Sequence, residues 1–344
     1  MSGSPGFLRT FTSPVLSSEV GDVLFQTDRE FARIYVMSAY SPDPVYSATL
    51  YPSADGVCTA FQLGDVITQW MRDNAFSFHS FIMGDSVSGV SMSLQVLRSS
   101  FVSVGLIDGF NEVLRKPLLS STVDVLSRYA RSFFHYLRPS PPHADDLKVS
   151  ALVSGRLFDG SVQQVAWTLD ASLVDDRICS VAVRPDVLRD DINDGLDDDS
   201  EFAEISAVVL NPKSMPSVSA SVFVSDDPDL MGFSFINSFG LLESLFLHGE
   251  AVPELTVDAE SAVIGHRTVM YDVEQSQSFK VEARNIAQSD WRKVVQFLAS
   301  PEVYDAESGR RIFISDISQE PPKAYGSLGS VKFNYSYEDS RLVF

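Results

Sequence analysis

The sequence predicts a mainly β protein of two or three β-sandwich-like domains with a few short helices. Near the C-terminus, Val331, Phe333, Tyr335 and Tyr337 alternate with polar residues, which places all four aromatic or aliphatic side chains on one face of a strand. Composition agrees, because 24 Phe and 11 Tyr favour strands over helices. The length of 344 residues exceeds what one ordinary core accommodates.

An N-terminal β-rich domain is expected over residues 1–138. Gly64-Asp65 would begin a short helix whose inward side chains include Ile67 and Trp70. Residues 123–137 fit either a helix or two strands, since they lack a convincing cap. The remaining expected elements are a strand at 31–40, a hairpin formed by 47–51 and 57–61, and strands at 76–83 and 91–104.

Prolines separate this domain from the next. Pro139, Pro141 and Pro142 preclude regular structure and indicate a linker. A middle β domain is expected over 144–225, interrupted by an acidic loop at 190–201. The last domain, 226–344, is expected to contain one helix at about 289–299, with Trp291, Val294, Val295 and Leu298 on its apolar side, and a strand at 269–273 behind a Gly265-His266 turn.

Charge and hydropathy exclude several classes of partner. A formal net charge of −20 would repel nucleic-acid phosphates and an anionic membrane surface. No apolar run approaches the roughly 18 residues of a membrane span. The N-terminus lacks the basic and apolar regions of a secretory signal, so we expect a soluble protein made in the bacterial cytoplasm.

The acidic loop is the best match to a metal-binding motif. Asp190, Asp194, Asp198 and Glu201 fall at positions one, five, nine and twelve of an EF-hand calcium loop, with Gly195 at six. Position three is Ile192, which offers no oxygen, and the flanking segments are typical of strands rather than helices. We therefore expect an exposed, hydrated loop that binds no metal tightly, with weak calcium binding as the alternative.

Other chemistry-bearing residues form no recognisable site. The five histidines lack metal-ligand spacing, and the sequence holds no nucleophile elbow, P-loop or dinucleotide motif. No catalytic residue and no cofactor is therefore predicted. The pairs Asp175-Asp176 and Asp258/Glu260 could serve a glycosidase, but among 46 acidic residues they are expected by chance. Core packing is the simpler expectation for Trp70, Trp167 and Trp291 and for Cys58 and Cys179.

The C-terminal domain carries a family resemblance. The segments 233–240, 243–249 and 271–279, then the helix 291–298 and the strand 331–337, occur in an order that resembles uncharacterised proteins from the tail regions of bacteriophages and prophages of gut bacteria. Residues 50–57 and 63–66 look like the same group. The resemblance implies a virion structural protein of the tail or baseplate, and it brings no catalytic residues.

Three functions remain open at this stage. The leading hypothesis is a non-enzymatic tail or baseplate protein, which would reside in the virion, form homo-oligomers and bind neighbouring tail proteins. The second is a β-sandwich module that binds a carbohydrate or a cell surface, with a glycan as partner. The third is a glycan hydrolase, which should show clustered carboxylates or histidines in a concave site.

Overall fold

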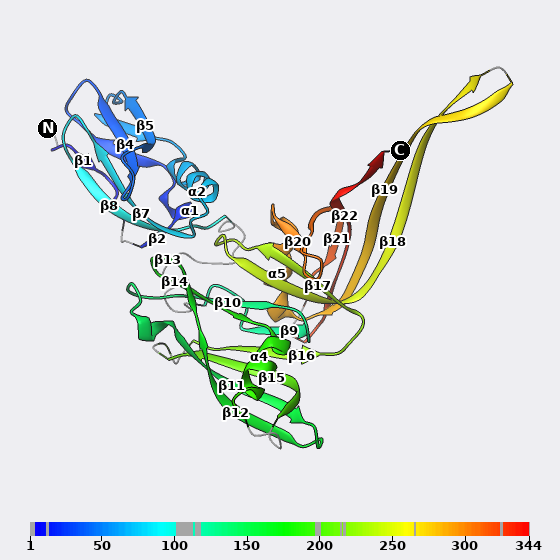
Figure 1. Ribbon diagram of the computed structural model, residues 1–344. Helices are drawn as coiled ribbons and strands as arrows, with labels where there is room; N and C mark the ends of the chain where they lie inside the picture. Colours follow the sequence, from blue (N-terminus) through cyan, green and yellow to red (C-terminus); the bar gives the residue numbers. More distant parts are fainter. Residues whose placement is uncertain are drawn as a thin grey trace.

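A computed structural model describes residues 4–11, 14–100, 113, 118–196, 201–213, 215, 218–264, 266–323 and 326–343. Strands far outnumber helices among these residues, which confirms the predicted mainly β class. Figure 1 shows three units in chain order, blue, green, and yellow to red, and a long hairpin that projects from the last of them.

The N-terminal unit contains two sheets and two helices. The helix α2 (Leu63–Asp73) is confirmed as predicted, and its buried side chains at Leu63, Ile67 and Met71 repeat every four residues, as packing of one helix face requires. The other elements are α1 (Ser17–Val20), a sheet ordered β2 (Val15–Leu16), β8 (Ser91–Leu97), β7 (Phe78–Asp85), β4 (Ala32–Ser38), β5 (Pro44–Leu50), and a sheet ordered β1 (Gly6–Phe7), β3 (Val23–Gln26), β6 (Val57–Ala60).

The predicted hairpin of residues 47–51 and 57–61 does not form. Strand β5 pairs with β4, and β6 pairs with β3 in the other sheet. Each strand therefore pairs with one that precedes it in the chain, and the turn at Gly56 links two sheets instead of closing a hairpin. The predicted strand at 91–104 extends from Ser91 to Leu97, and residues 101–104 lie outside the described residues.

The middle unit packs a five-stranded sheet against a three-stranded sheet and one helix. Its core is aliphatic and aromatic, with Tyr136 and Phe202 fully buried. The elements are the sheet ordered β12 (Val162–Asp170), β11 (Lys148–Leu157), β15 (Phe202–Pro212), β16 (Ala220–Ser225), β9 (Val123–Ser127), the sheet ordered β10 (Ser132–Leu137), β14 (Ile178–Val183), β13 (Ser172–Asp175), the 3₁₀ helix η2 (Ala144–Leu147) and the helix α4 (Pro185–Asn193).

Strand pairing places the boundary of this unit earlier than the sequence suggests. Residues 123–137 form the two strands β9 and β10, and not a helix. β9 pairs in parallel with β16, and β10 pairs with β14. Both strands thus belong to the middle unit, and the proline-rich segment after Leu137 is a connection within that unit. The prolines mark a break in regular structure, which need not be a domain boundary.

The C-terminal unit is a closed six-stranded barrel, where the sequence predicts a sandwich. The alternation in β22 is confirmed, because Val331, Phe333 and Tyr335 are buried. Phe333 packs edge-on against Phe297 of the predicted helix. The elements are β17 (Leu230–Ile236), β18 (Leu242–Ile264), β19 (Arg267–Ile286), β22 (Gly329–Val343), β21 (Arg311–Glu320), β20 (Val303–Asp305) and α5 (Gln288–Ala299).

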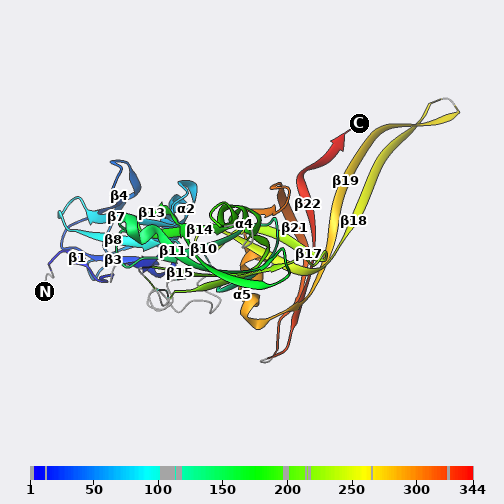
Figure 2. The same cartoon turned by 60° about the horizontal axis from the view of Figure 1, so that its bottom comes forward.

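Strands β18 and β19 leave the barrel as a paired ribbon, which we call the arm (residues 250–282). Strand β22 pairs with the inner part of the arm as far as Glu274, and the outer part is two-stranded. Strand β17 stops pairing with β18 at His248, whereas β18 and β19 stay paired up to Ile264 and Arg267. Fifteen register steps separate the pair Gly249–Ala283 from this tip, so the arm extends about 50 Å at roughly 3.3 Å per residue. Figures 1 and 2 both show it pointing away from the three units.

A single apolar cluster, which we call the junction, joins the three units. Phe78 comes from the N-terminal unit, Ile178 from the middle unit and Leu241 from the barrel, and each is at least 98% buried. Backbone contacts follow the same path, since Ser100 N–H donates to Ser238 O at 3.1 Å. The remaining members of the cluster are Leu16, Leu97, Val113, Leu119, Leu137 and Phe239.

Candidate functional site

The predicted calcium loop is partly helical. Asp190 lies in α4, which begins with Pro185 and buries Leu188 and Ile192 one turn apart. Its carboxylate is 2.6 Å from Arg189 Nη2, an ion pair within the same helix. Asp194 follows at the helix C-terminus, and Asp198 lies outside the described residues. The pattern at Leu188 and Ile192 outweighs the loop-like composition because those two side chains complete the core of the middle unit.

The other residues considered from sequence are engaged in packing or hydrogen bonds. Cys58 and Cys179 are both buried and not bonded to each other, as expected for small core residues. Trp70 stacks on Phe76 at 5.7 Å between ring centroids. Trp167 and Trp291 pack against the cores of the middle unit and the barrel. Within the described part of the chain, no three His, Cys, Asp or Glu side chains are placed to hold a metal ion.

The carboxylate pair Asp175-Asp176 connects two units. Asp175 Oδ2 accepts hydrogen bonds from the backbone N–H groups of Ser77 (2.7 Å) and Phe78 (2.9 Å). Burial raises the pKa of the Asp175 carboxyl, and these two hydrogen bonds oppose that shift. Asp176 accepts a hydrogen bond from Tyr40 Oη at 2.8 Å. The pair therefore holds the turn between β13 and β14 against the N-terminal unit. The second pair, Asp258/Glu260, lies on β18 in the arm.

A buried charge cluster lies between the middle unit and the barrel. Lys293 of α5 donates to Asp124 of β9 and lies 3.9 Å from Glu243 of β18. All three side chains are at least 91% buried. Burial raises the pKa of the Asp124 carboxyl, and the nearby Glu243 carboxylate adds a smaller effect in the same direction; the Lys293 ammonium and the Ser132 hydroxyl oppose the shift.

Neighbouring polar groups complete the cluster. Glu243 Oε1 accepts from both the backbone N–H and the hydroxyl of Ser121 at 2.9 Å, and its Oε2 accepts from Asn237 Nδ2 at 3.1 Å. His135 Nε2 donates to Leu242 O at 2.6 Å, which leaves the buried Nδ1 with no hydrogen-bond partner among the described residues. Burial lowers the pKa of His135.

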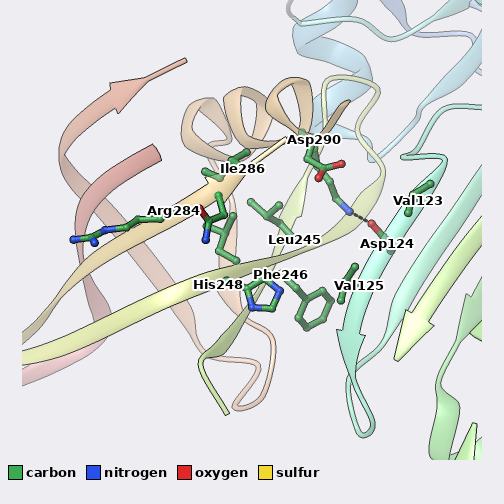
Figure 3. Close-up of a pocket in the computed structure, with 12 residues that line it drawn as sticks. Val123, Asp124, Val125, Leu245, Phe246, His248, Arg284, Ile286 and Asp290 are labelled. Atoms are coloured by element: carbon green, nitrogen blue, oxygen red, sulfur yellow. Dashed lines mark hydrogen bonds and ion pairs between the residues drawn. The ribbon is translucent and has the colours of Figure 1, made fainter. Parts of the chain in front are cut away.

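The space beside this cluster is small. One cavity of about 170 Å³ is lined by Ser121, Glu243, Lys293 and Gln296, among others. A second, of about 100 Å³, lies between β9 and the barrel, where Figure 3 shows the Asp124 contact beside Leu245 and Phe246. Sites for small-molecule ligands usually enclose about 300–1,000 Å³. Both of these cavities are smaller than that, and the cluster itself forms a buried contact between two units.

A larger and more open hollow lies where the arm leaves the barrel, and we call it the root hollow. It has a volume of about 810 Å³ and is lined by residues from the β16–β17 turn, β18 and β19. His248 Nδ1 lies 3.1 Å from Asp227 Oδ2 at its edge. Hydrogen bonds from Arg284 and Lys332 lower the pKa of the Glu282 carboxyl. The lining residues are Asp227, Asp229, His248, Gly249, Glu250, Glu282, Arg284 and Asn285.

A glycine fixes the geometry of this hollow. Gly249 pairs with Ala283 at the first step of the arm, and a Cβ at residue 249 would come within 2.2 Å of Glu282 O. Only glycine allows the two backbones to approach this closely. The arm thus begins at a defined point with its two strands pressed together.

Sequence reasoning could not have found either the charge cluster or the root hollow. The cluster joins residues at least 50 positions apart in the sequence, Asp124, Glu243 and Lys293. From sequence alone, a charged residue in a strand or helix is expected to face solvent. The one available signal was Lys293 among Trp291, Val294 and Phe297 in α5, since a lysine beside the apolar face of a helix needs an acidic partner when it is buried.

Neither known protein-family models nor curated protein sequences match this chain. Among the described helices, none is long and apolar enough to cross a bilayer.

Proposed function

We propose that the chain is a non-enzymatic structural protein of a phage or prophage tail, in the baseplate or distal tail region. It would work by binding copies of itself and neighbouring tail proteins. The observation that carries this proposal is the combination of a body whose units share the junction with an arm about 50 Å long whose outer part, beyond Glu274, is paired only as two strands in the described chain.

The arm supports a binding role because its outer part is poorly stabilised by the rest of the chain. A two-stranded ribbon without a third strand is marginally stable in water. Strand β22 accompanies β19 only as far as Glu274, so the outer part of the ribbon has two free edges. Free edges bind other strands or surfaces. A second surface that covers the arm would stabilise it, and assembly with other subunits supplies that surface.

The tail assignment rests on the resemblance of the C-terminal segments to phage tail proteins. The chemistry of the described residues favours assembly over the two alternatives. The tryptophans that could stack on sugars pack internally, and the Asp175-Asp176 pair is used in a contact between units. The buried charge cluster lies beside cavities too small for a glycan.

The test is to ask whether the chain is part of a particle. Phage particles induced from the host would be purified by density gradient, and their proteins quantified by mass spectrometry. We expect this chain at a fixed ratio to the other tail proteins, together with binding of the purified chain to at least one of them. Absence from particles, combined with binding to host glycans or release of sugars from a polysaccharide, would replace the proposal with a glycan-directed function.

A further inference from the structure

The arm carries its charges in an uneven pattern. Between residues 250 and 282 the sequence holds seven acidic residues and two basic ones, Arg267 and Lys280. Lys280 is near the barrel, so Arg267 is the basic residue of the distal arm, and it lies at the tip beside His266. Both tip side chains are exposed. An acidic ribbon thus ends in a small cationic point.

The root hollow has the opposite charge. Four carboxylates line it together with Arg284 and His248. Glu282 is paired with Arg284 and Lys332, and Asp227 lies 3.1 Å from His248. In the described part of the chain, Asp229 and Glu250 have no Lys or Arg within ion-pair distance, and both are exposed. A volume of about 810 Å³ lies inside the range of about 300–1,000 Å³ that holds small ligands, which leaves room for two side chains.

We propose that the arm tip of one copy of this chain, with His266 and Arg267, docks into the root hollow of a second copy. This inference rests on the proposed function and names the contact by which copies would assemble. The tip cannot reach its own hollow, because the paired strands hold the two about 50 Å apart. The cationic tip and the acidic hollow of one chain are held apart by the paired strands, so they can meet only between two copies.

The contact is head-to-tail, so each copy uses its tip on one neighbour and its hollow on another. Such heterologous contacts generate rings when the rotation closes and filaments when it does not. Exposed Val252 and Leu255 lie on the arm just beyond the hollow and would add apolar contact around the charged centre. The spacing between successive copies along the arm would be close to the arm length, about 50 Å.

The test uses mixed single-cysteine variants, since the native cysteines are buried and will not compete. The full chain carrying His266→Cys and the full chain carrying Glu250→Cys would each receive a different affinity tag and be mixed with a short bismaleimide. We expect a cross-linked dimer that contains both tags. Glu30→Cys, at an exposed position of the N-terminal unit, is the matched control and should not link to His266→Cys.

Charge reversal gives an independent measurement. Arg267→Glu should weaken self-association by at least about tenfold at low salt, and 0.5 M NaCl should weaken wild-type association in the same direction. Lys323→Glu, another exposed cation outside the arm, should change it less than twofold. Circular dichroism and thermal midpoints would establish that every variant is folded.

Two results would overturn the inference: no mixed-tag product above the control, or an Arg267→Glu chain that associates as wild type does. If the chain is nevertheless a stoichiometric part of phage particles, the proposed function stands and only this contact is wrong. If the cross-link forms but the chain is absent from particles, the contact stands and the tail assignment is wrong.

Discussion

The charge cluster and the arm both carry acidic residues, but in opposite environments. In the charge cluster, Asp124 and Glu243 are buried, share Lys293 and receive hydrogen bonds from Ser121 and Asn237. On the inner arm, Glu250 and Glu254 are exposed. Burial makes the charge cluster sensitive to the loss of any partner. Charge on the arm affects solubility and recognition, and folding stability depends on it little.

The largest effect is expected from Lys293→Met, which leaves two carboxylates buried without a cation. Breaking a buried ion pair by removing one partner costs about 3–5 kcal/mol. We expect a loss of this size in the free energy of unfolding, measured by urea denaturation. Lys332→Met is the matched control, because Lys332 is exposed and solvent screens its ion pair with Glu282 at 3.1 Å, so its loss should cost far less than that of Lys293. Equal losses in the two variants would contradict the stabilising role of the charge cluster.

Two leucine substitutions compare the junction with the arm directly. Leu241→Ala empties part of the cluster shared by the three units and should cost about 2–5 kcal/mol, as other buried leucine truncations do. Leu255→Ala, on the arm and 64% exposed, should change the free energy of unfolding by less than about 0.5 kcal/mol. Differential scanning calorimetry of both variants would measure the difference. A cost at Leu255 as large as that at Leu241 would mean that the arm is part of the folding core.

A smaller, pH-dependent effect is expected from His135. Burial lowers its pKa in the folded protein, so the unfolded chain binds a proton that the folded chain does not, between the folded-state pKa and about 6.5. This contribution to stability is therefore complete above about pH 6.5 and decreases as the pH falls through that window. His135→Leu should flatten the pH profile of unfolding between pH 7 and 5. Phe134→Leu, at the next buried position, should shift the profile without changing its slope.

Removal of most of the arm should also change stability little. Pro253 and Phe279 are paired, so an Asn-Gly turn can replace residues 254–278 and close the shortened hairpin. We expect the free energy of unfolding to change by less than about 1 kcal/mol, because the replaced residues pair mainly with one another and a two-stranded hairpin is marginally stable by itself. Self-association should be abolished in sedimentation experiments. A shortened chain that fails to fold would show that the arm stabilises the body.

Sequence reasoning succeeded where one periodicity decides the structure. The alternation at Val331–Tyr335 and the helix α5 are local signals, and both elements form as predicted. The predicted face of α5 is only partly right, because Phe297 is buried in the core and Val295, expected there, is half-buried. The sequence also predicted a turn at Gly265-His266. His266 is a turn residue between the paired Ile264 and Arg267, and Gly265 lies outside the described residues. The predicted strand at 269–273 covers only part of β19, so the sequence did not predict the arm's length.

Sequence reasoning failed where pairing is non-local. Strands β5 and β6 are neighbours in sequence, yet each pairs with an earlier strand. The parallel pairing of β9 with β16 joins residues about 100 positions apart and moves the domain boundary. The charge cluster of Asp124, Glu243 and Lys293 depends on how distant strands pack together. Local sequence patterns therefore could not predict it.

The continuity of β18 and β19 from the barrel wall into the arm has a mechanical consequence. The same strands form both, and the hydrogen bonds between them run perpendicular to the strand axis. A force that pulls one strand along this axis loads many of these bonds in parallel, whereas a force that peels the tip apart would load them one at a time. The arm therefore resists tension along its length better than splaying, and it would transmit a pull at its tip into the barrel wall.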